Sequence, residues 1–169
     1  MIQDGRSGKV ILLSHCILNM NAVCEGSSSP SHYPAIVNEI MDLIQAHQIG
    51  VIQLPCPEQE MYGLDRKARD RKFYNNEGFR RHCHALAVKA VQQIKEYKSK
   101  GYEVVGFIGR TGSPTCNVDG NHGIFVEELS KELRVRSLRL RMLSFDWRKM
   151  GERLMELREA LESKATNTH

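Results

Sequence analysis

The sequence predicts an α/β fold, with helices on both faces of a mainly parallel sheet. Short apolar runs alternate along the chain with longer amphipathic segments, which is typical of strands joined by crossover helices. Such crossovers are right-handed and cover both faces of the sheet. We therefore expect a three-layer, doubly wound domain of the Rossmann or flavodoxin-like type. A length of 169 residues favours one such domain over residues 1–162, and residues 163–169 are expected to form a disordered tail.

The first half of the chain supplies two predicted strands and one predicted helix. "KVILLS" (9–14) is a compact apolar run, which is typical of a buried strand. The segment after it has apolar residues at helical spacing: Tyr33, Ile36, Val37, Ile40, Met41 and Ile44. This spacing predicts a helix, which we expect Gly50 to end. "VIQLP" (51–55) is the second strand, and "CPEQEMYGLDRKARDRK" (56–72) is expected to be a loop.

The second half continues the alternation. A long helix is predicted at about 77–99, where one apolar stripe contains Phe79, Cys83, Leu86, Ala87, Ala90, Ile94 and Tyr97. "YEVVGFIG" (102–109) is the third strand, and "GIFVEELSKEL" (123–133) is a helix. "VRSLRLRML" (135–143) is expected to be a fourth strand with alternating charge at the edge of the sheet. The last helix begins near Asp146.

The composition excludes several classes of protein. With 41% apolar and 26% charged residues the chain resembles an ordinary globule, and a net charge of +4 is too small to argue for nucleic acid by itself. No apolar run approaches the roughly 20 residues of a membrane helix, and no signal-peptide pattern is present. We therefore predict a cytoplasmic protein that binds neither membranes nor DNA. Five cysteines, an odd number, argue for reduced thiols rather than disulfides.

Three of the cysteines follow three predicted strands. Cys16 comes just after the first strand, Cys56 comes after the second in "QLPCPE", and Cys116 lies in the loop after the third. In an open parallel sheet, ligands bind beyond the carboxyl ends of the strands, where such loops converge. We therefore expect these thiols to meet at one edge of the sheet, although no short CxxC spacing announces a metal site.

Three convergent thiolates suit a soft metal centre. Structural zinc and most iron–sulfur clusters take four protein ligands, whereas three thiolates around a four-iron cluster would leave one iron open to a substrate atom. Glu58 and Ser113 would then form a polar rim. The alternative is that the cysteines are core residues, since cysteine is among the most buried residue types. Pro55, Pro57 and Pro114 beside two of the cysteines favour the metal site, because they make rigid turns.

Three segments resemble the signature segments of the DUF523 family, the thiouracil desulfidases. These segments are "SHCILNMNAVCEG", "CPEQEMYGLDR" and "GSPTCNVD". The family pattern runs roughly S-x-C-L-L-G…C, then C-P-E…G, then G-S-P-S-C-G, in the same order and at matching strand ends. The resemblance covers most of residues 9–120.

The resemblance implies a [4Fe-4S] cluster held by Cys16, Cys56 and Cys116. It also implies that the sulfur of a thiolated pyrimidine, as in thiouracil or thiouridine, binds the open iron and leaves as sulfide. The family's acid/base glutamate corresponds to Glu58, and its serine corresponds to Ser113. Independently of the resemblance, replacing sulfur by oxygen requires a group that moves protons and activates water, which a carboxylate can do.

The sequence departs from the family pattern near the expected pocket. Asn19 and Asn117 stand where the family has glycine, and asparagine tolerates left-handed backbone better than most residues. "EQEMYGLDR" lacks the family's double glycine, so we expect Tyr62 and Arg66, together with Asn117, to bind a different ring or a phosphate. The expected partner is a small thiolated base, nucleoside or nucleotide. RNA is compatible with the basic run at 66–72 but is not predicted, since a solvated surface explains that run as well.

Two other functions remain open from the sequence. A cluster-bearing sulfur carrier would have the same cysteines but would not need Glu58. A flavodoxin-like module that binds a nucleotide or flavin without catalysis would need a phosphate-cradling loop after the first strand, which "SHCILNMN" does not offer. Cys24 is not counted as a ligand and is expected to be structural or to line the pocket. Cys83 is expected in the core, and for His15 both a role near the cluster and none remain open.

Overall fold

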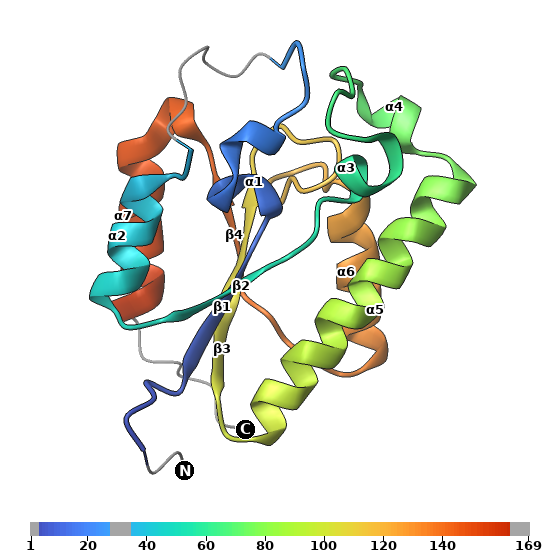
Figure 1. The fold of residues 1–169 in the computed structure, drawn as a ribbon. Helices are drawn as coiled ribbons and strands as arrows, with labels where there is room; N and C mark the ends of the chain where they lie inside the picture. Colours follow the sequence, from blue (N-terminus) through green and yellow to red (C-terminus); the bar gives the residue numbers. More distant parts are fainter. Residues whose placement is uncertain (1–3, 28–34, 163–169) are drawn as a thin grey trace.

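The structure is a computed structural model that describes residues 4–27 and 35–162 of the chain. Its centre is an all-parallel sheet with the strand order β2-β1-β3-β4 (Figure 1). The strands are β1 (Lys9–Leu13), β2 (Gly50–Gln53), β3 (Glu103–Arg110) and β4 (Met142–Phe145). This order is that of flavodoxin-like folds, and it confirms the predicted doubly wound α/β class.

The long helices lie in pairs on the two faces of the sheet (Figure 1). On one face lie α2 (Asn38–Ala46) and α7 (Met150–Glu162), and on the other lie α5 (Glu77–Ser99) and α6 (Ile124–Val135). Shorter helices gather around the carboxyl ends of the strands: α1 (His15–Leu18), η1 (Met20–Ala22), α3 (Pro57–Tyr62), α4 (Arg71–Tyr74) and η2 (Trp147–Lys149). No helix in the described residues is long and apolar enough to span a membrane.

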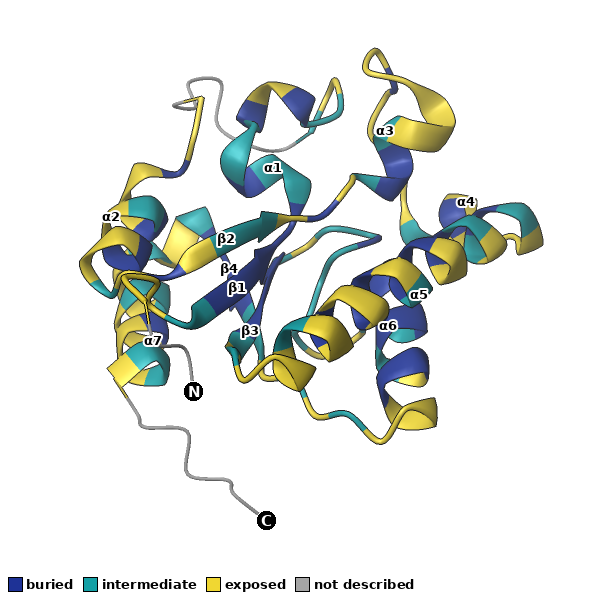
Figure 2. Cartoon of the chain, turned by 60° about the horizontal axis from the view of Figure 1, so that its bottom comes forward, coloured by how far each residue is buried: buried dark blue, intermediate teal, exposed yellow. Residues whose placement is uncertain are grey.

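Each face of the sheet packs against its own apolar cluster. Because side chains alternate along a strand, Leu12 of β1 joins the cluster with α5 and α6, whereas Ile11 and Leu13 join the cluster with α2 and α7. Phe107 and Ile108 of β3 divide in the same way, and Figure 2 shows the central strands buried between the layers. A strand buried on both faces is apolar along its whole length, which explains why "KVILLS" predicts the strand β1.

The long helix α5 was predicted with the bounds that the structure shows. The Asn76 side chain caps its first turn by accepting a hydrogen bond from the Phe79 N–H at 3.0 Å. The predicted apolar stripe is buried except for Tyr97, which is partly exposed. The strong periodicity over six turns made this helix the clearest element in the sequence.

The helix before β2 is shorter than predicted, and Gly50 does not end it. It begins at Asn38, so that Ile36 precedes it and is exposed, while Tyr33 lies outside the described residues. It ends at Ala46, after which Gln48 takes the left-handed conformation with a φ of 54°. Gly50 is the first residue of β2.

The predicted fourth strand is displaced along the chain. The helix α6 continues to Val135, and its end is closed by a hydrogen bond from the Leu138 N–H to the Leu133 carbonyl at 2.9 Å. The strand β4 begins only at Met142, so most of the charged stretch is a connection. The alternating leucines and arginines of this stretch fit a helix end and turn as well as a strand, which misled the prediction. The edge position of β4 was predicted correctly. The predicted tail at 163–169 lies outside the described residues.

The predicted loop at 56–72 contains a helix. Cys56 is extended, with φ −84° and ψ 112°, and Pro57 occupies the first position of α3. Proline suits that position, because its missing N–H would have no partner there in any case. Pro57, the second proline after β2, therefore begins a helix, which turns Glu58 back toward the strand ends. The prediction of an irregular loop was wrong here.

Candidate active site

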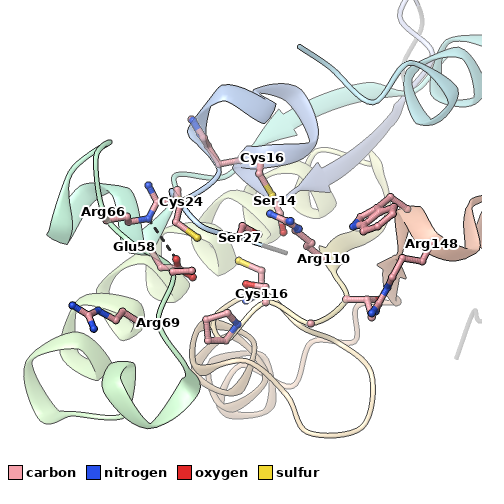
Figure 3. Close-up of a pocket in the computed structure, with 18 residues that line it drawn as sticks. Ser14, Cys16, Cys24, Ser27, Glu58, Arg66, Arg69, Arg110, Cys116 and Arg148 are labelled. Atoms are coloured by element: carbon pink, nitrogen blue, oxygen red, sulfur yellow. Dashed lines mark hydrogen bonds and ion pairs between the residues drawn. The ribbon is translucent and has the colours of Figure 1, made fainter. Parts of the chain in front are cut away.

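A pocket of about 380 Å³ opens at the carboxyl ends of β1, β2 and β3. It lies beyond β1 and β3, the adjacent strands at which the strand order reverses, which is where open α/β sheets bind ligands. Figure 3 shows side chains from several loops pointing into it. Its volume falls within the range of about 300–1,000 Å³ that is usual for small-molecule sites.

Four thiols line this pocket. Cys16 lies in the short helix α1 directly after β1, Cys56 immediately precedes α3 after β2, and Cys116 lies in the connection after β3. These are the three strand ends that the sequence predicted, and Cys24 comes from the segment after η1. All five cysteines of the chain are free thiols. The fifth, Cys83, is fully buried on α5 in the apolar core and does not line the pocket. The fold therefore separates one core cysteine from four pocket cysteines.

The loop that carries Cys116 folds back tightly onto the end of β3. The Arg110 N–H donates to the Cys116 carbonyl at 3.1 Å, and a Cβ on Gly109 would overlap that same carbonyl oxygen. A Cβ on Gly123 would overlap the backbone of Thr115. Both glycines are therefore required for the close approach that places Cys116 over the sheet edge.

Ser113, one of the two predicted catalytic residues, lines the pocket and shapes this loop. Its hydroxyl oxygen accepts hydrogen bonds from the backbone N–H groups of Thr115 at 3.2 Å and Cys116 at 3.0 Å. The Ser113 hydroxyl therefore holds the Cys116 backbone in place and still has its own proton to donate into the pocket.

Glu58, the predicted acid/base, is 7% exposed and lines the same pocket. Three donors hold its carboxylate. Oε2 accepts from Arg66 Nε at 3.4 Å and from the Tyr74 hydroxyl at 3.2 Å, while Oε1 accepts from the Thr115 hydroxyl. In the loop after β3, the hydroxyl that donates to the carboxylate is thus that of Thr115, the neighbour of Cys116, and not that of Ser113. These contacts fix the Glu58 carboxylate relative to Cys56, which Arg66 also contacts, and relative to Cys116, which follows Thr115.

Arg66, a predicted substrate-binding residue, lines the pocket but is bonded to the protein itself. Its side chain is buried and forms an ion pair with Glu58. It also donates to the Gly63 carbonyl at 3.2 Å and to the Ala22 carbonyl at 2.7 Å, and Nη2 lies 3.7 Å from Cys56 Sγ. Arg66 therefore positions Glu58 and ties the end of α3 to the last residue of η1.

The other two predicted substrate-binding residues do not line the pocket. The Asn117 amide donates to the Asn121 carbonyl at 2.9 Å, and its oxygen accepts from the Gly112 N–H at 3.1 Å, so it braces the loop. Tyr62 packs in an aromatic group, with its ring centroid 5.4 Å from that of Phe73.

Neither asparagine that replaces a family glycine uses the left-handed backbone region. Asn19 has a φ of −148°. Asn117 is not among the non-glycine residues with positive φ, which in the described residues are Gln48 and Ser137. The backbone conformation at these two positions therefore does not require glycine.

The thiols disfavour each other's ionisation. Burial raises the pKa of Cys56 to about 11, and burial followed by the charges of Cys56 and Cys16 raises the pKa of Cys116 well above its usual value. Burial also raises the pKa of Cys16, against the opposing charge of Arg110. The thiols are therefore protonated at neutral pH unless a positive group enters the pocket.

One buried polar atom beside the thiols, Nε2 of His15, has no hydrogen-bond partner within the described part of the chain, and His15 lines the pocket just after β1. The neighbouring Ser14 hydroxyl is also buried and faces the Cys116 thiol, where it opposes part of the rise in pKa that burial causes. Burial lowers the pKa of His15, so its ring is neutral at pH 7 and can donate or accept. A buried group without a partner costs free energy, and it indicates that the pocket binds something with hydrogen-bonding capacity.

The donor set fits an iron–sulfur cluster held by Cys16, Cys56 and Cys116. Positively charged iron would remove the mutual penalty on the thiolates and release their protons. Over residues 4–27 and 35–162, no three His, Cys, Asp or Glu side chains are grouped as ligands of a single metal ion. Each cysteine of a cluster binds a different iron, so cluster ligands stand farther apart than the ligands of one ion.

Sequence reasoning missed several polar residues of the site, among them Thr115, Arg110 and Tyr74. Thr115 stands within the quoted "GSPTCN" segment, and Arg110 ends β3 and lines the pocket, so the strand-end rule would have found both. Tyr74 bonds to Glu58 from α4 and has no such signal in the sequence. Its role depends on how α4 packs against α3, which no local pattern predicts.

One relative is similar to this chain over most of its length. The uncharacterized protein MJ0003 of Methanocaldococcus jannaschii is 30% identical over 137 residues, which cover 81% of this chain and 85% of that protein. No family model matches the chain, and no solved structure matches it significantly. The similarity to the archaeal protein therefore extends over the domain rather than over one motif.

Proposed function

The chain belongs to the same family as MJ0003 of Methanocaldococcus jannaschii, and we propose that it is an iron–sulfur-dependent desulfidase acting on a thiolated pyrimidine base, nucleoside or nucleotide. The observation that carries the proposal is the convergence of Cys16, Cys56 and Cys116 with a buried carboxylate, Glu58, in one pocket. The resemblance to the DUF523 segments supports the reaction type.

The cofactor would be a [4Fe-4S] cluster on Cys16, Cys56 and Cys116. When bound, it would supply an iron without a thiolate from these three residues, a Lewis acid with high affinity for the sulfur of a thiocarbonyl. The overall reaction exchanges C=S for C=O: water supplies the oxygen and two protons, and hydrogen sulfide leaves.

Glu58 is the residue in position to move these protons. Its carboxylate is held by Arg66, Tyr74 and Thr115, so it keeps one orientation at the pocket wall. It can take a proton from the attacking water and return it to the departing sulfur. Ser113 can donate its hydroxyl proton to the substrate, since its oxygen already accepts from the loop. A sulfur carrier would have no need of this buried acid/base, so Glu58 favours catalysis.

The test is anaerobic reconstitution with iron and sulfide. We expect about four irons per chain and a broad visible absorption, both lost in Cys16→Ser, Cys56→Ser and Cys116→Ser and both retained in Cys83→Ala, the core control. The reconstituted protein should then release sulfide from 2-thiouracil or 4-thiouracil, or from the corresponding nucleoside or nucleotide.

If the Cys16→Ser, Cys56→Ser and Cys116→Ser variants bound as much iron as the wild type, the proposed cluster ligation would be refuted. A correctly ligated cluster that releases no sulfide from any of these compounds would leave a carrier role in place of catalysis.

A further inference from the structure

The fourth pocket thiol, Cys24, has no role in the mechanism above. It is partly exposed, lines the pocket with the three predicted ligands, and forms no disulfide. Figure 3 shows its sulfur directed into the pocket on the same side as Glu58, facing Cys116 and Cys16 across the space. A cysteine that served only the core would be enclosed as Cys83 is.

Arg66 holds the segment of Cys24 on the Glu58 wall. Its Nη2 donates to the Ala22 carbonyl at 2.7 Å, and its carbonyl accepts from the Glu25 N–H at 3.0 Å. These two bonds flank Cys24 in the sequence. The charge of Glu58 is, after burial, the largest influence that raises the pKa of the Cys24 thiol, which is consistent with their proximity. The residue that orients the acid/base thus also orients this thiol.

We propose that Cys24 is a fourth, displaceable thiolate ligand that closes the open iron of the cluster while no substrate is bound. This inference rests on the proposed function. Catalysis by Glu58 requires the open iron to face the Glu58 wall, where Figure 3 shows Cys24. Cys56, whose Sγ lies 3.7 Å from Arg66 Nη2, is near the same wall but is already one of the three proposed ligands. The guanidinium groups of Arg66 and Arg110 offset the added negative charge of the thiolate.

The exchange involves no electron transfer. The Cys24 thiolate would leave the iron as the thiocarbonyl sulfur of the substrate takes its place, and it would then accept a proton from water. Soft ligands displace a thiolate from iron more readily than oxygen ligands do. A thiolated base would therefore open the site, whereas water or the ordinary oxygen-containing base would not. The same closure would protect the cluster from loss of an iron.

Mössbauer spectra of protein reconstituted with ⁵⁷Fe test the ligand directly. In the wild type we expect four irons in equivalent sulfur environments, and in Cys24→Ser one iron of the four should become distinct. The distinct iron should also appear in the wild type when 4-thiouracil is added. A wild type that already shows one distinct iron, unchanged by Cys24→Ser, would overturn the proposal while leaving the three-cysteine cluster intact. No cluster in either protein would overturn the proposed function and this inference together.

Alkylation of the wild-type holoprotein tests the displacement without any variant. Iodoacetamide should label Cys24 slowly in the resting protein and severalfold faster after 4-thiouracil is added, as measured by mass spectrometry of the Cys24 peptide. Uracil is the matched control ligand and should cause no increase. Cys83 should stay unlabelled throughout, because it is fully buried. Equal labelling of Cys24 with and without 4-thiouracil would contradict a displaceable ligand.

Discussion

Glu58 combines features that a structural carboxylate would not need. It is nearly inaccessible, it forms an ion pair with a buried arginine, and it accepts from two hydroxyl groups, yet it borders a pocket lined by thiols. Burying an ion pair costs several kcal/mol in desolvation and rarely repays it in stability alone. Because Glu58 lies at the pocket wall, the ion pair and hydrogen bonds have a functional explanation: they hold a proton acceptor in one orientation beside the pocket.

Replacing Glu58 by glutamine should separate catalysis from cluster binding. The amide oxygen of Glu58→Gln can replace Oε2 and accept from Arg66 and Tyr74, while the amide NH2 takes the place of Oε1 and can donate to the Thr115 hydroxyl oxygen. The group can no longer exchange a proton. Sulfide release should fall by about 10²–10⁴-fold, the usual contribution of a general acid/base. Iron content should remain that of the wild type.

Glu60→Gln is the matched control for this substitution. Glu60 belongs to the same helix, but its side chain is 44% exposed and pairs with His82 at the surface. It should keep both activity and iron. If Glu58→Gln released sulfide at the wild-type rate, Glu58 would not be the acid/base of the reaction.

At the level of elements, the connection from β3 to α6 is the part of the chain that builds the site. It supplies Ser113 and Cys116 to the pocket and Thr115 as a hydrogen-bond donor to Glu58, and it packs closely against the backbone at Gly109 and Gly123. No regular secondary structure holds residues 111–123, so close backbone contact and side-chain hydrogen bonds fix their shape. A methyl group at either glycine would push this connection outward.

Gly109→Ala and Gly123→Ala should therefore each lower the free energy of unfolding by about 1–3 kcal/mol, the usual cost of overpacking. Each should also reduce the iron bound on reconstitution, because Cys116 moves with the loop. Thermal denaturation and iron analysis measure the two effects.

Gly151→Ala in α7 is the control for the glycine variants. Nothing lies within 4 Å of the added Cβ, and alanine is the better helix former, so this variant should be as stable as the wild type or slightly more stable. Variants at Gly109 or Gly123 that match it in stability and iron content would show that the loop yields without cost.

For the molecule as a whole, the strands of one sheet contribute side chains to two apolar clusters, one on each face. The cluster with α5 and α6 and the cluster with α2 and α7 meet back to back through the same strands, β1 and β3. Neither pair of helices can keep its core if the strands come apart. The pocket sits at the end of these two shared strands, so its geometry depends on both layers.

The domain should accordingly unfold in one cooperative transition. Trp147, the only tryptophan, lines the pocket and packs with the α2–α7 cluster, whereas the long helix α5 of the other layer contributes strongly to the far-ultraviolet circular dichroism. Midpoints of urea unfolding from Trp147 fluorescence and from circular dichroism should coincide. A separate, earlier fluorescence transition would show that the α2–α7 layer unfolds independently.

The sequence by itself determined the fold class and the meeting of three thiols. Local physics suffices for both, since buried strands are continuous apolar runs, α5 is strongly periodic, and parallel strands place their carboxyl ends at one edge. It failed where patterns are ambiguous: the arginine–leucine alternation before β4 fits two structures, and Pro57 suits a turn as well as the first position of the helix α3.

Only the tertiary structure decided which polar groups serve the site. Cys24 joins the pocket because Arg66 ties its segment to α3, and Thr115 rather than Ser113 reaches Glu58 because the loop after β3 folds back over two glycines. Tyr62 packs against other aromatic rings, and Asn117 forms hydrogen bonds within the loop after β3, so neither lines the pocket. Such contacts join residues far apart in the sequence at distances set by packing, and packing is a property of the assembled layers rather than of any segment.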